Sequence, residues 1–272
     1  MVWIVGGLQR DMHMKYVDAH IHLSDEEYAS CVDEVIAEAK TANVVATVSN
    51  SVDLKTSKGN LALVERYPGL VYVALGIHPW NVQMLTDKEL EETIKFIREQ
   101  QGNEGVVAIG EIGLDSKYMP IWDRQMMVFD RMLHLAEELD LPTVVHSRGV
   151  TEQIIDMLPS YSVKNVLLHW FSNPVSALPR AIDKGYYITE GPTAVYSDGI
   201  QDVVRKVPLD KLMTETDGPV RYFRPPFKGA KTTPAFIPTV VKTVAELKGM
   251  DGVDVAKQMA TNFERFFAVK LN

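Results

Sequence analysis

The sequence predicts a (β/α)8 TIM barrel. Two observations carry this prediction: eight short apolar segments recur along the chain, and segments with helical periodicity lie between them. A third is the length of 272 residues, since one α/β barrel typically has about 250 residues. We therefore expect a single domain over residues 1–272, in which residues 1–13 form an N-terminal extension before the regular pattern begins.

The eight apolar segments are rich in β-branched and large apolar residues, and most are nearly continuous rather than alternating. This pattern is typical of parallel strands that are buried on both faces. The predicted strands are residues 16–19, 44–48, 71–75, 106–109, 143–145, 166–168, 186–189 and 212–214.

The segments between these strands have apolar residues at helical spacing, as in residues 26–40, 87–100, 122–138 and 174–184. Thr86 followed by Glu89 forms a capping box, which predicts the start of one helix. Gly185 follows another helix at the position that favours glycine. After the eighth strand, residues 234–249 and 253–269 are predicted helices that close the barrel from outside.

The formal net charge of −8 predicts a surface that repels nucleic acids and other polyanions as a whole. A substrate that carries phosphate must then be held by a local basic patch or by metal. The apolar run at residues 2–5 is too short to span a membrane, and no signal-peptide pattern is present. We expect a cytoplasmic protein without a membrane partner.

Histidines gather at the carboxyl ends of the predicted strands. His20 and His22 end the first strand, and alternate residues of an extended segment point to one side, so two imidazoles can share one metal ion. Barrels of this type carry their active sites at this face. Five of the seven histidines lie there: His20, His22, His78, His146 and His169.

Two acids complete the set. Glu111 ends the fourth strand and Asp217 ends the eighth. Carboxylate and imidazole groups without a thiolate suit a catalytic centre for Zn²⁺, Mn²⁺ or Mg²⁺ better than a structural zinc site. The alternative is that these acids only cap helices or pair with barrel arginines.

Further residues near these ends are candidates for substrate binding. Arg148 offers a bidentate fork for phosphate, or else forms an ion pair with a barrel carboxylate. His78 precedes a proline and is a candidate hydrogen-bond donor to a phosphoryl oxygen, or else a turn residue. Residues 218–231 place Arg221 and Arg224 among aromatic residues, a composition that can grip single-stranded DNA. The alternative is a solvated loop with its aromatic side chains packed beneath it.

Taken in order, these motifs resemble the TatD family of metal-dependent deoxyribonucleases, in the amidohydrolase superfamily. The resemblance runs from about residue 16 to residue 267. It is carried by Asp18-Ala-His-Ile-His22, Gly76-Ile-His-Pro79, Gly110-Glu-Ile-Gly-Leu-Asp115, Gln125 with Phe129, Leu141-Pro-Thr-Val-Val-His-Ser-Arg148, His169-Trp-Phe-Ser172, Glu215-Thr-Asp-Gly-Pro219 and Asn262.

The resemblance implies a centre of two divalent metal ions, Zn, Mg or Mn. By that likeness His20, His22 and Asp217 hold the first metal, His146 and His169 hold the second, and Glu111 bridges the two. Many binuclear amidohydrolases use a carboxylated lysine as the bridge. No lysine is available at the end of the fourth strand, which favours the TatD branch.

The expected function is a deoxyribonuclease that cleaves the phosphodiester bonds of DNA, single-stranded or from an end, with a hydroxide activated by the two metals. Asp217 is the candidate that orients the attacking water and takes its proton, with Glu111 and His78 also in the catalytic set. One alternative is a metal-dependent amidohydrolase or phosphoesterase that acts on a small molecule. Another is a binding protein without catalysis, which the intact set of metal ligands argues against.

Overall fold

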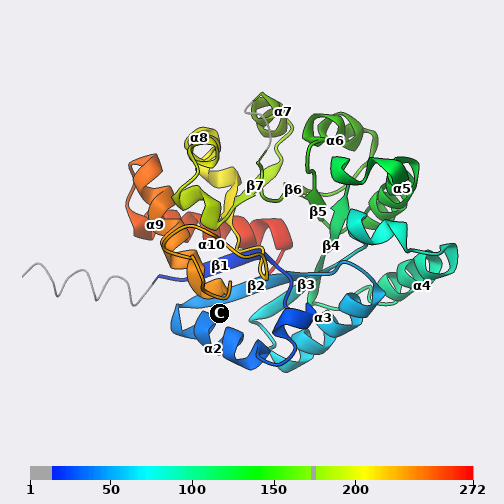
Figure 1. Cartoon of the computed structure of the whole chain (residues 1–272), viewed down its shortest axis with the longest axis horizontal. Coiled ribbons are helices and arrows are strands. Elements are labelled where there is room, and N and C mark those ends of the chain that lie inside the picture. The colour runs from blue at the N-terminus through cyan, green and yellow to red at the C-terminus, as the bar shows by residue number, and fades with distance from the viewer. Residues whose placement is uncertain (1–13, 173–175, 272) are drawn as a thin grey trace, which may run out of the picture.

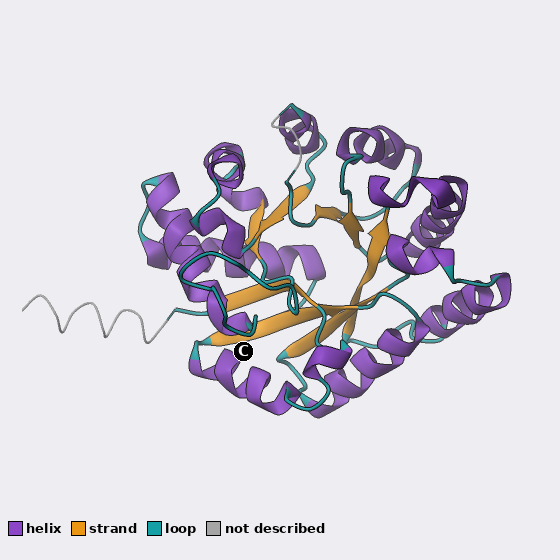
Figure 2. Ribbon diagram, viewed as in Figure 1, coloured by secondary structure: helices purple, strands orange, loops and turns teal. Residues whose placement is uncertain are grey.

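In the computed structural model, which describes residues 14–172 and 176–271, eight parallel strands form one sheet in the order β1 to β8. The helices surround the strands in a ring (Figure 1), and colouring by secondary structure separates the inner strands from the outer helices (Figure 2). The strands are β1 (Tyr16–Ile21), β2 (Val44–Asn50), β3 (Val71–Leu75), β4 (Val106–Gly113), β5 (Thr143–His146), β6 (Val166–Leu168), β7 (Tyr187–Glu190) and β8 (Leu212–Thr214).

The α-helices follow the strands around the ring. They are α2 (Val32–Thr41), α3 (Leu54–Arg66), α4 (Asp87–Arg98), α5 (Trp122–Leu139), α6 (Thr151–Met157), α7 (Ala177–Asp183), α8 (Asp198–Lys206), α9 (Ile237–Lys248) and α10 (Gly252–Phe267). Short 3-10 turns connect them: η1 (Glu26–Tyr28), η2 (Pro79–Gln83), η3 (Ser116–Ile121), η4 (Leu158–Ser160), η5 (Pro192–Val195), η6 (Leu209–Lys211) and η7 (Pro234–Phe236).

Hydrogen bonds between the first and last strands bring the sheet close to a closed barrel. The Thr214 hydroxyl donates to the Val17 carbonyl at 2.9 Å, and the amide of Asp217 donates to the His20 carbonyl at 2.9 Å. The α10 helix packs against β1 and β8, and its buried Asn262 amide donates to the carbonyls of Leu209 and Leu212, both at 2.7 Å. The predicted (β/α)8 barrel is confirmed.

All eight predicted strands are present, and several extend further toward their carboxyl ends than their apolar pattern. β1 continues through His20, β4 through Glu111, and β5 through His146. These polar residues are buried in the barrel. The apolar pattern could not mark them as strand residues because they are selected for polar chemistry.

The helix predicted at residues 26–40 is wrong in its first part. Asp25 caps the short turn η1, where its carboxylate accepts from the Glu27 amide at 2.8 Å. The backbone at Cys31 then leaves the helical region, with φ −143° and ψ 15°, and α2 begins only at Val32. Glycine and proline, the residues that usually mark such a break, are absent from this segment.

The two predicted helix signals are confirmed. Thr86 and Glu89 form a reciprocal capping box at the start of α4, and Gly185 follows α7 with φ +76°. The predicted extension at residues 1–13 and the predicted helix start at residue 174 lie outside the described residues. Over the part of the chain that the structure describes, no helix is long and apolar enough to cross a membrane.

Candidate metal centre

The predicted metal-ligating residues meet at the carboxyl ends of the strands, because all eight strands run in the same direction. In the register of β4 with β5, Gly113 pairs with His146, which places Glu111 beside that histidine. A pocket of about 760 Å³ opens over this rim. Its lining includes His22, His78, Glu111, His146, His169 and Asp217, and His20 lies fully buried beneath it.

One group of side chains gathers around the Oε2 atom of Glu111. The Nε2 atoms of His20 and His22 lie 3.3 and 3.2 Å from it, and 3.2 Å from each other. Oδ1 of Asp217 lies 3.4 and 3.5 Å from the same two nitrogens. Four ligands about 2.0–2.1 Å from a tetrahedral zinc ion stand about 3.3 Å apart. These four atoms therefore have the spacing of a metal-binding cage.

A second group gathers around Oε1, the other carboxylate oxygen of Glu111. Nε2 of His169 lies 2.7 Å from it and Nδ1 of His146 lies 2.9 Å from it. These two nitrogens are 3.4 Å apart. Glu111 thus presents one oxygen to each group, and the buried clusters are suited to binding metal ions.

Neighbouring acceptors orient three of the histidines. Nδ1 of His22 lies 3.0 Å from the Asn50 carbonyl, which holds a proton on Nδ1 and leaves Nε2 free to bind a cation. Nε2 of His146 lies 2.9 Å from Oδ2 of Asp115. Nδ1 of His169 faces the buried Glu215 carboxylate at 3.6 Å. Each ring is thereby turned toward Glu111 through its other nitrogen.

His78 differs from these histidines in its hydrogen bonding. Its Nδ1 accepts from the amide of Trp80 at 3.1 Å, so the proton of the neutral ring is on Nε2. Burial lowers the pKa of His78 to about 4 despite the attraction of Glu111, which keeps the ring neutral. Its Nε2 lies 3.2 Å from Oε1 of Glu111. Although His78 is close enough to join the second group, its tautomer makes Nε2 a hydrogen-bond donor.

The cluster is strongly polarised. Burial alone would raise the pKa of Glu111, but the surrounding histidines, above all His78, His169 and His20, hold it well below its usual range. For His22, burial would lower the pKa, but hydrogen bonds to Asp217 and Glu111 raise it to about 10. The acids keep their negative charge, and the imidazoles beside them favour bound cations. This is the electrostatic environment that a divalent metal ion requires.

Arg148 forms the ion pair that was one of its two predicted roles. Its Nε donates to Oδ1 of Asp115 at 3.0 Å, and its Nη2 lies 2.8 Å from Oδ2 without the alignment of a hydrogen bond. Arg148 also lines the pocket. The buried Asp115 holds both Arg148 and His146, and it is a functional residue to which the sequence reasoning gave no role. Its signal was the second acid of the Gly110–Asp115 motif.

The two arginines of residues 218–231 lie in different places. Arg221 lines the pocket and pairs with Glu27 at 2.6 Å. Arg224 is absent from the lining and stacks on Tyr196, with Cζ 5.7 Å from the ring centroid. Two of the aromatic side chains, Tyr222 and Phe227, are buried under the loop, as the alternative predicted. Phe223 is 80% exposed.

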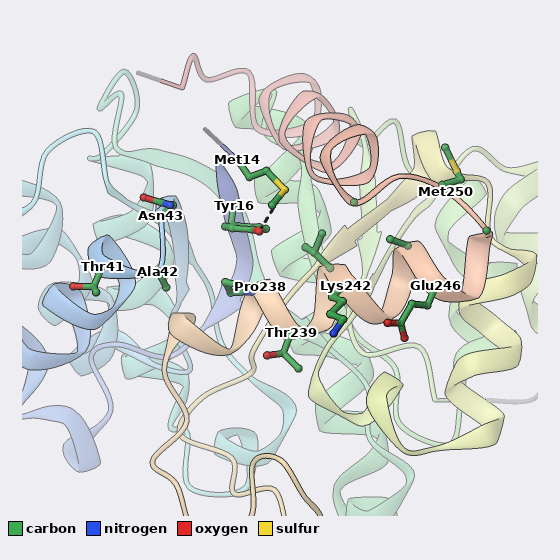
Figure 3. Close-up of a pocket in the computed structure, with 14 residues that line it drawn as sticks. Met14, Tyr16, Thr41, Ala42, Asn43, Pro238, Thr239, Lys242, Glu246 and Met250 are labelled. Atoms are coloured by element: carbon green, nitrogen blue, oxygen red, sulfur yellow. Dashed lines mark hydrogen bonds between the residues drawn. The ribbon is translucent and has the colours of Figure 1, made fainter. Parts of the chain in front are cut away.

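A second pocket, of about 660 Å³, lies beside the start of β1, between α9 and the segment that joins α2 to β2 (Figure 3). Met14 and Tyr16 line it from β1, and Lys242 and Glu246 line it from α9. Its lining contains no histidine and one acid. Because metal-ligating groups converge only at the first pocket among the described residues, the chemistry belongs there.

Comparison with known protein families agrees with this site. The family described as "TatD related DNase" matches residues 17–268. This chain belongs to the TatD-related DNase family. It is therefore a metal-dependent hydrolase of the TatD type, and the predicted family is confirmed.

TatD relatives occur across distant organisms. An uncharacterized metal-dependent hydrolase of Bacillus subtilis, YabD, is 31% identical over 93% of this chain and 98% of its own length. The human deoxyribonuclease TATDN3 is 30% identical over 92% of this chain and 94% of its own length. The crystal structure of YJJV, a TatD homologue of Escherichia coli K12, has a TM-score of 0.87 and 28% identity, and covers 94% of this chain and 98% of that one.

Proposed function

We propose that this TatD-family protein is a deoxyribonuclease that hydrolyses phosphodiester bonds of DNA, as a single strand or from an end, with two divalent metal ions. The observation that carries the proposal is the division of the site by Glu111, whose two carboxylate oxygens face two separate groups of imidazoles. The human relative is called a deoxyribonuclease, which supports DNA as the substrate class.

The ligand sets follow the two groups. His20, His22 and Asp217 would hold one metal, His146 and His169 the other, and Glu111 would bridge them. The metals, when bound, supply a water of lowered pKa and neutralise charge on the phosphate. Zn²⁺, Mn²⁺ and Mg²⁺ all accept imidazole and carboxylate ligands to different degrees.

The remaining residues act on the substrate and on its protons. Asp217 keeps a negative charge, since hydrogen bonds to His20 and His22 outweigh the effect of burial and hold its pKa below the usual range. It is therefore a base that can orient the attacking water and accept its proton. The Nε2 proton of His78 and the guanidinium of Arg148 face the same pocket and can donate to phosphoryl oxygens.

The test is release of nucleotides from single-stranded DNA by the metal-free protein supplied in turn with Mg²⁺, Mn²⁺ and Zn²⁺. We expect cleavage that requires metal. Asp217→Asn should remove nearly all turnover, by a factor of about 10²–10⁴, and leave the fold and some metal in place. Normal rates in this variant would contradict the mechanism.

The same assay separates the proposal from its alternative. If two metals are bound and DNA is not cut, the substrate is a small phosphoester, amide or ester, which the same centre can hydrolyse. Turnover of p-nitrophenyl phosphate esters and of p-nitroanilide amides then identifies which bond is hydrolysed.

A further inference from the structure

Trp80 presents a large apolar ring at the mouth of the metal-centre pocket. It is 46% exposed and lines that pocket together with His78, His146 and Arg148. We propose that Trp80 forms a nucleobase subsite, on which the base next to the reacting phosphate stacks. This inference rests on the proposed function and names the part of the DNA that the protein recognises besides phosphate.

The position of Trp80 is tied to the metal centre through the chain itself. Trp80 lies in η2, two residues after His78, and its amide donates to Nδ1 of that histidine at 3.1 Å. The ring centroids of Trp80 and His78 are 4.8 Å apart, and those of Trp80 and His146 are 6.1 Å apart. A base on this ring is thus within one nucleotide of a phosphate at the centre.

The Trp80 ring is also held still. Its Nε1 donates to Oδ2 of the buried Asp115 at 2.5 Å. Cζ of Arg148 lies 5.2 Å from the ring centroid, and the Tyr118 ring lies 6.1 Å away at a tilt of 43°. A side chain that is fixed before binding loses little conformational entropy when a ligand stacks on it. Its only polar atom is already satisfied, so the part left exposed can only make apolar or stacking contacts.

Asp115 links recognition of the base with recognition of the phosphate. One carboxylate contacts Trp80, Arg148 and His146. The stacking ring, the cationic fork and a metal-facing imidazole therefore share one buried anchor. Base–aromatic stacking strengthens binding by about 5- to 150-fold per base and tolerates any sequence, because every base has a π face.

The experiment compares two ligands that differ only in the base. The protein loaded with Mn²⁺ is titrated calorimetrically with deoxyadenosine 5′-monophosphate and with 2-deoxyribose 5-phosphate. We expect the nucleotide to bind about 5- to 150-fold more tightly. Trp80→Ala should make the two affinities equal while the affinity for the sugar phosphate stays unchanged, and Trp80→Phe should keep part of the ratio.

Three outcomes overturn the inference. The wild-type protein binds both ligands equally, or Trp80→Ala weakens both by the same factor, which is the result of a purely structural role. The third is loss of the ratio in Phe223→Ala with Trp80→Ala unaffected, because the stacking ring then belongs to the loop. A ratio that depends on Trp80 in a protein that does not cut DNA supports the subsite and rejects only the nuclease activity.

Discussion

Glu111 is the residue that makes one site out of two groups of ligands. Its Oε2 faces His20 and His22, and its Oε1 faces His146 and His169. The carboxylate is buried among imidazoles that stabilise its charge. A carboxylate with both oxygens engaged can bridge two cations without the carboxylated lysine used in related centres.

His78 tests whether a histidine in this cluster is a donor or a ligand. Because its Nδ1 accepts from a backbone amide, we expect His78→Ala to keep the full metal content and to lower kcat by about 10²–10³, the usual effect of losing one preorganised donor. Metal content is measured by inductively coupled plasma mass spectrometry, and kcat with single-stranded DNA.

Two other histidines give the controls for this prediction. His146→Ala should lose metal, since its Nδ1 faces Glu111 at 2.9 Å. His134→Ala should change neither quantity, because that side chain is exposed on α5, away from the pocket. Metal loss in His78→Ala as large as in His146→Ala would mean that His78 is a ligand.

At the scale of the elements, Asp18 joins the first strand to the segment that follows the last. The buried carboxylate accepts from the Thr216 amide at 3.0 Å and from the Thr216 hydroxyl at 2.6 Å. It lies two residues before His20, and Thr216 lies next to Asp217. This contact therefore sets the distance between ligands that are far apart in the sequence.

We expect Asp18→Ala to lower the free energy of unfolding by about 2–4 kcal/mol, because it leaves two buried donors of Thr216 without an acceptor. Urea titration of the metal-free protein measures this. Thr216→Val removes only the hydroxyl and should cost about 1 kcal/mol. A change below about 0.5 kcal/mol in Asp18→Ala would show that the strands are held together without this contact.

The loop at residues 218–231 carries the basic side chain nearest the pocket. Arg221 lines the pocket and Arg224 does not. We expect affinity for a single-stranded oligonucleotide to fall steeply with added salt, and Arg221→Ala to reduce the slope of log K against log salt by about 0.7, the value for one phosphate contact. Fluorescence anisotropy over a range of NaCl concentrations measures the slope.

Arg224→Ala is the matched variant for this loop, since its guanidinium stacks on Tyr196 instead of facing the pocket. It should leave the slope close to that of the wild type. A salt response that is flat in the unmodified protein would exclude this loop as a DNA-binding element.

For the whole molecule, the metal centre couples the strands of the barrel. Its candidate ligands come from β1, β4 and β5 and from the segments after β1, β6 and β8. A cation bound to them stabilises only the folded state, because the unfolded chain does not bring these groups together. The net charge of −8 also makes the local cations the place where a polyanion can bind.

Removal of metal with EDTA should therefore lower the melting temperature, by about 5–10 °C at metal concentrations near 100 times the dissociation constant. Differential scanning calorimetry before and after Mn²⁺ or Zn²⁺ is restored measures the shift. His20→Ala should reduce it. A melting temperature that ignores both EDTA and added metal would show that the centre contributes nothing to stability.

The amino-acid sequence by itself predicted the barrel, the places of its eight strands, and the gathering of His20, Glu111 and Asp217 at one rim. It could do so because burial on both faces leaves a local apolar pattern, and because parallel strands end at the same face. The family was predicted from motifs in their order along the chain. The ligand assignments stay predictions that the metal analyses above can test.

Only the tertiary structure decided how these side chains meet. The division of the Glu111 oxygens, the tautomer of His78 and the pairing of Arg148 with Asp115 each depend on atoms from different strands. The exposure of Trp80 likewise depends on which neighbours cover it. A sequence pattern records the direction and burial of a residue within its own element, but contacts across a barrel are fixed by register, closure and side-chain rotamers, which no local pattern contains.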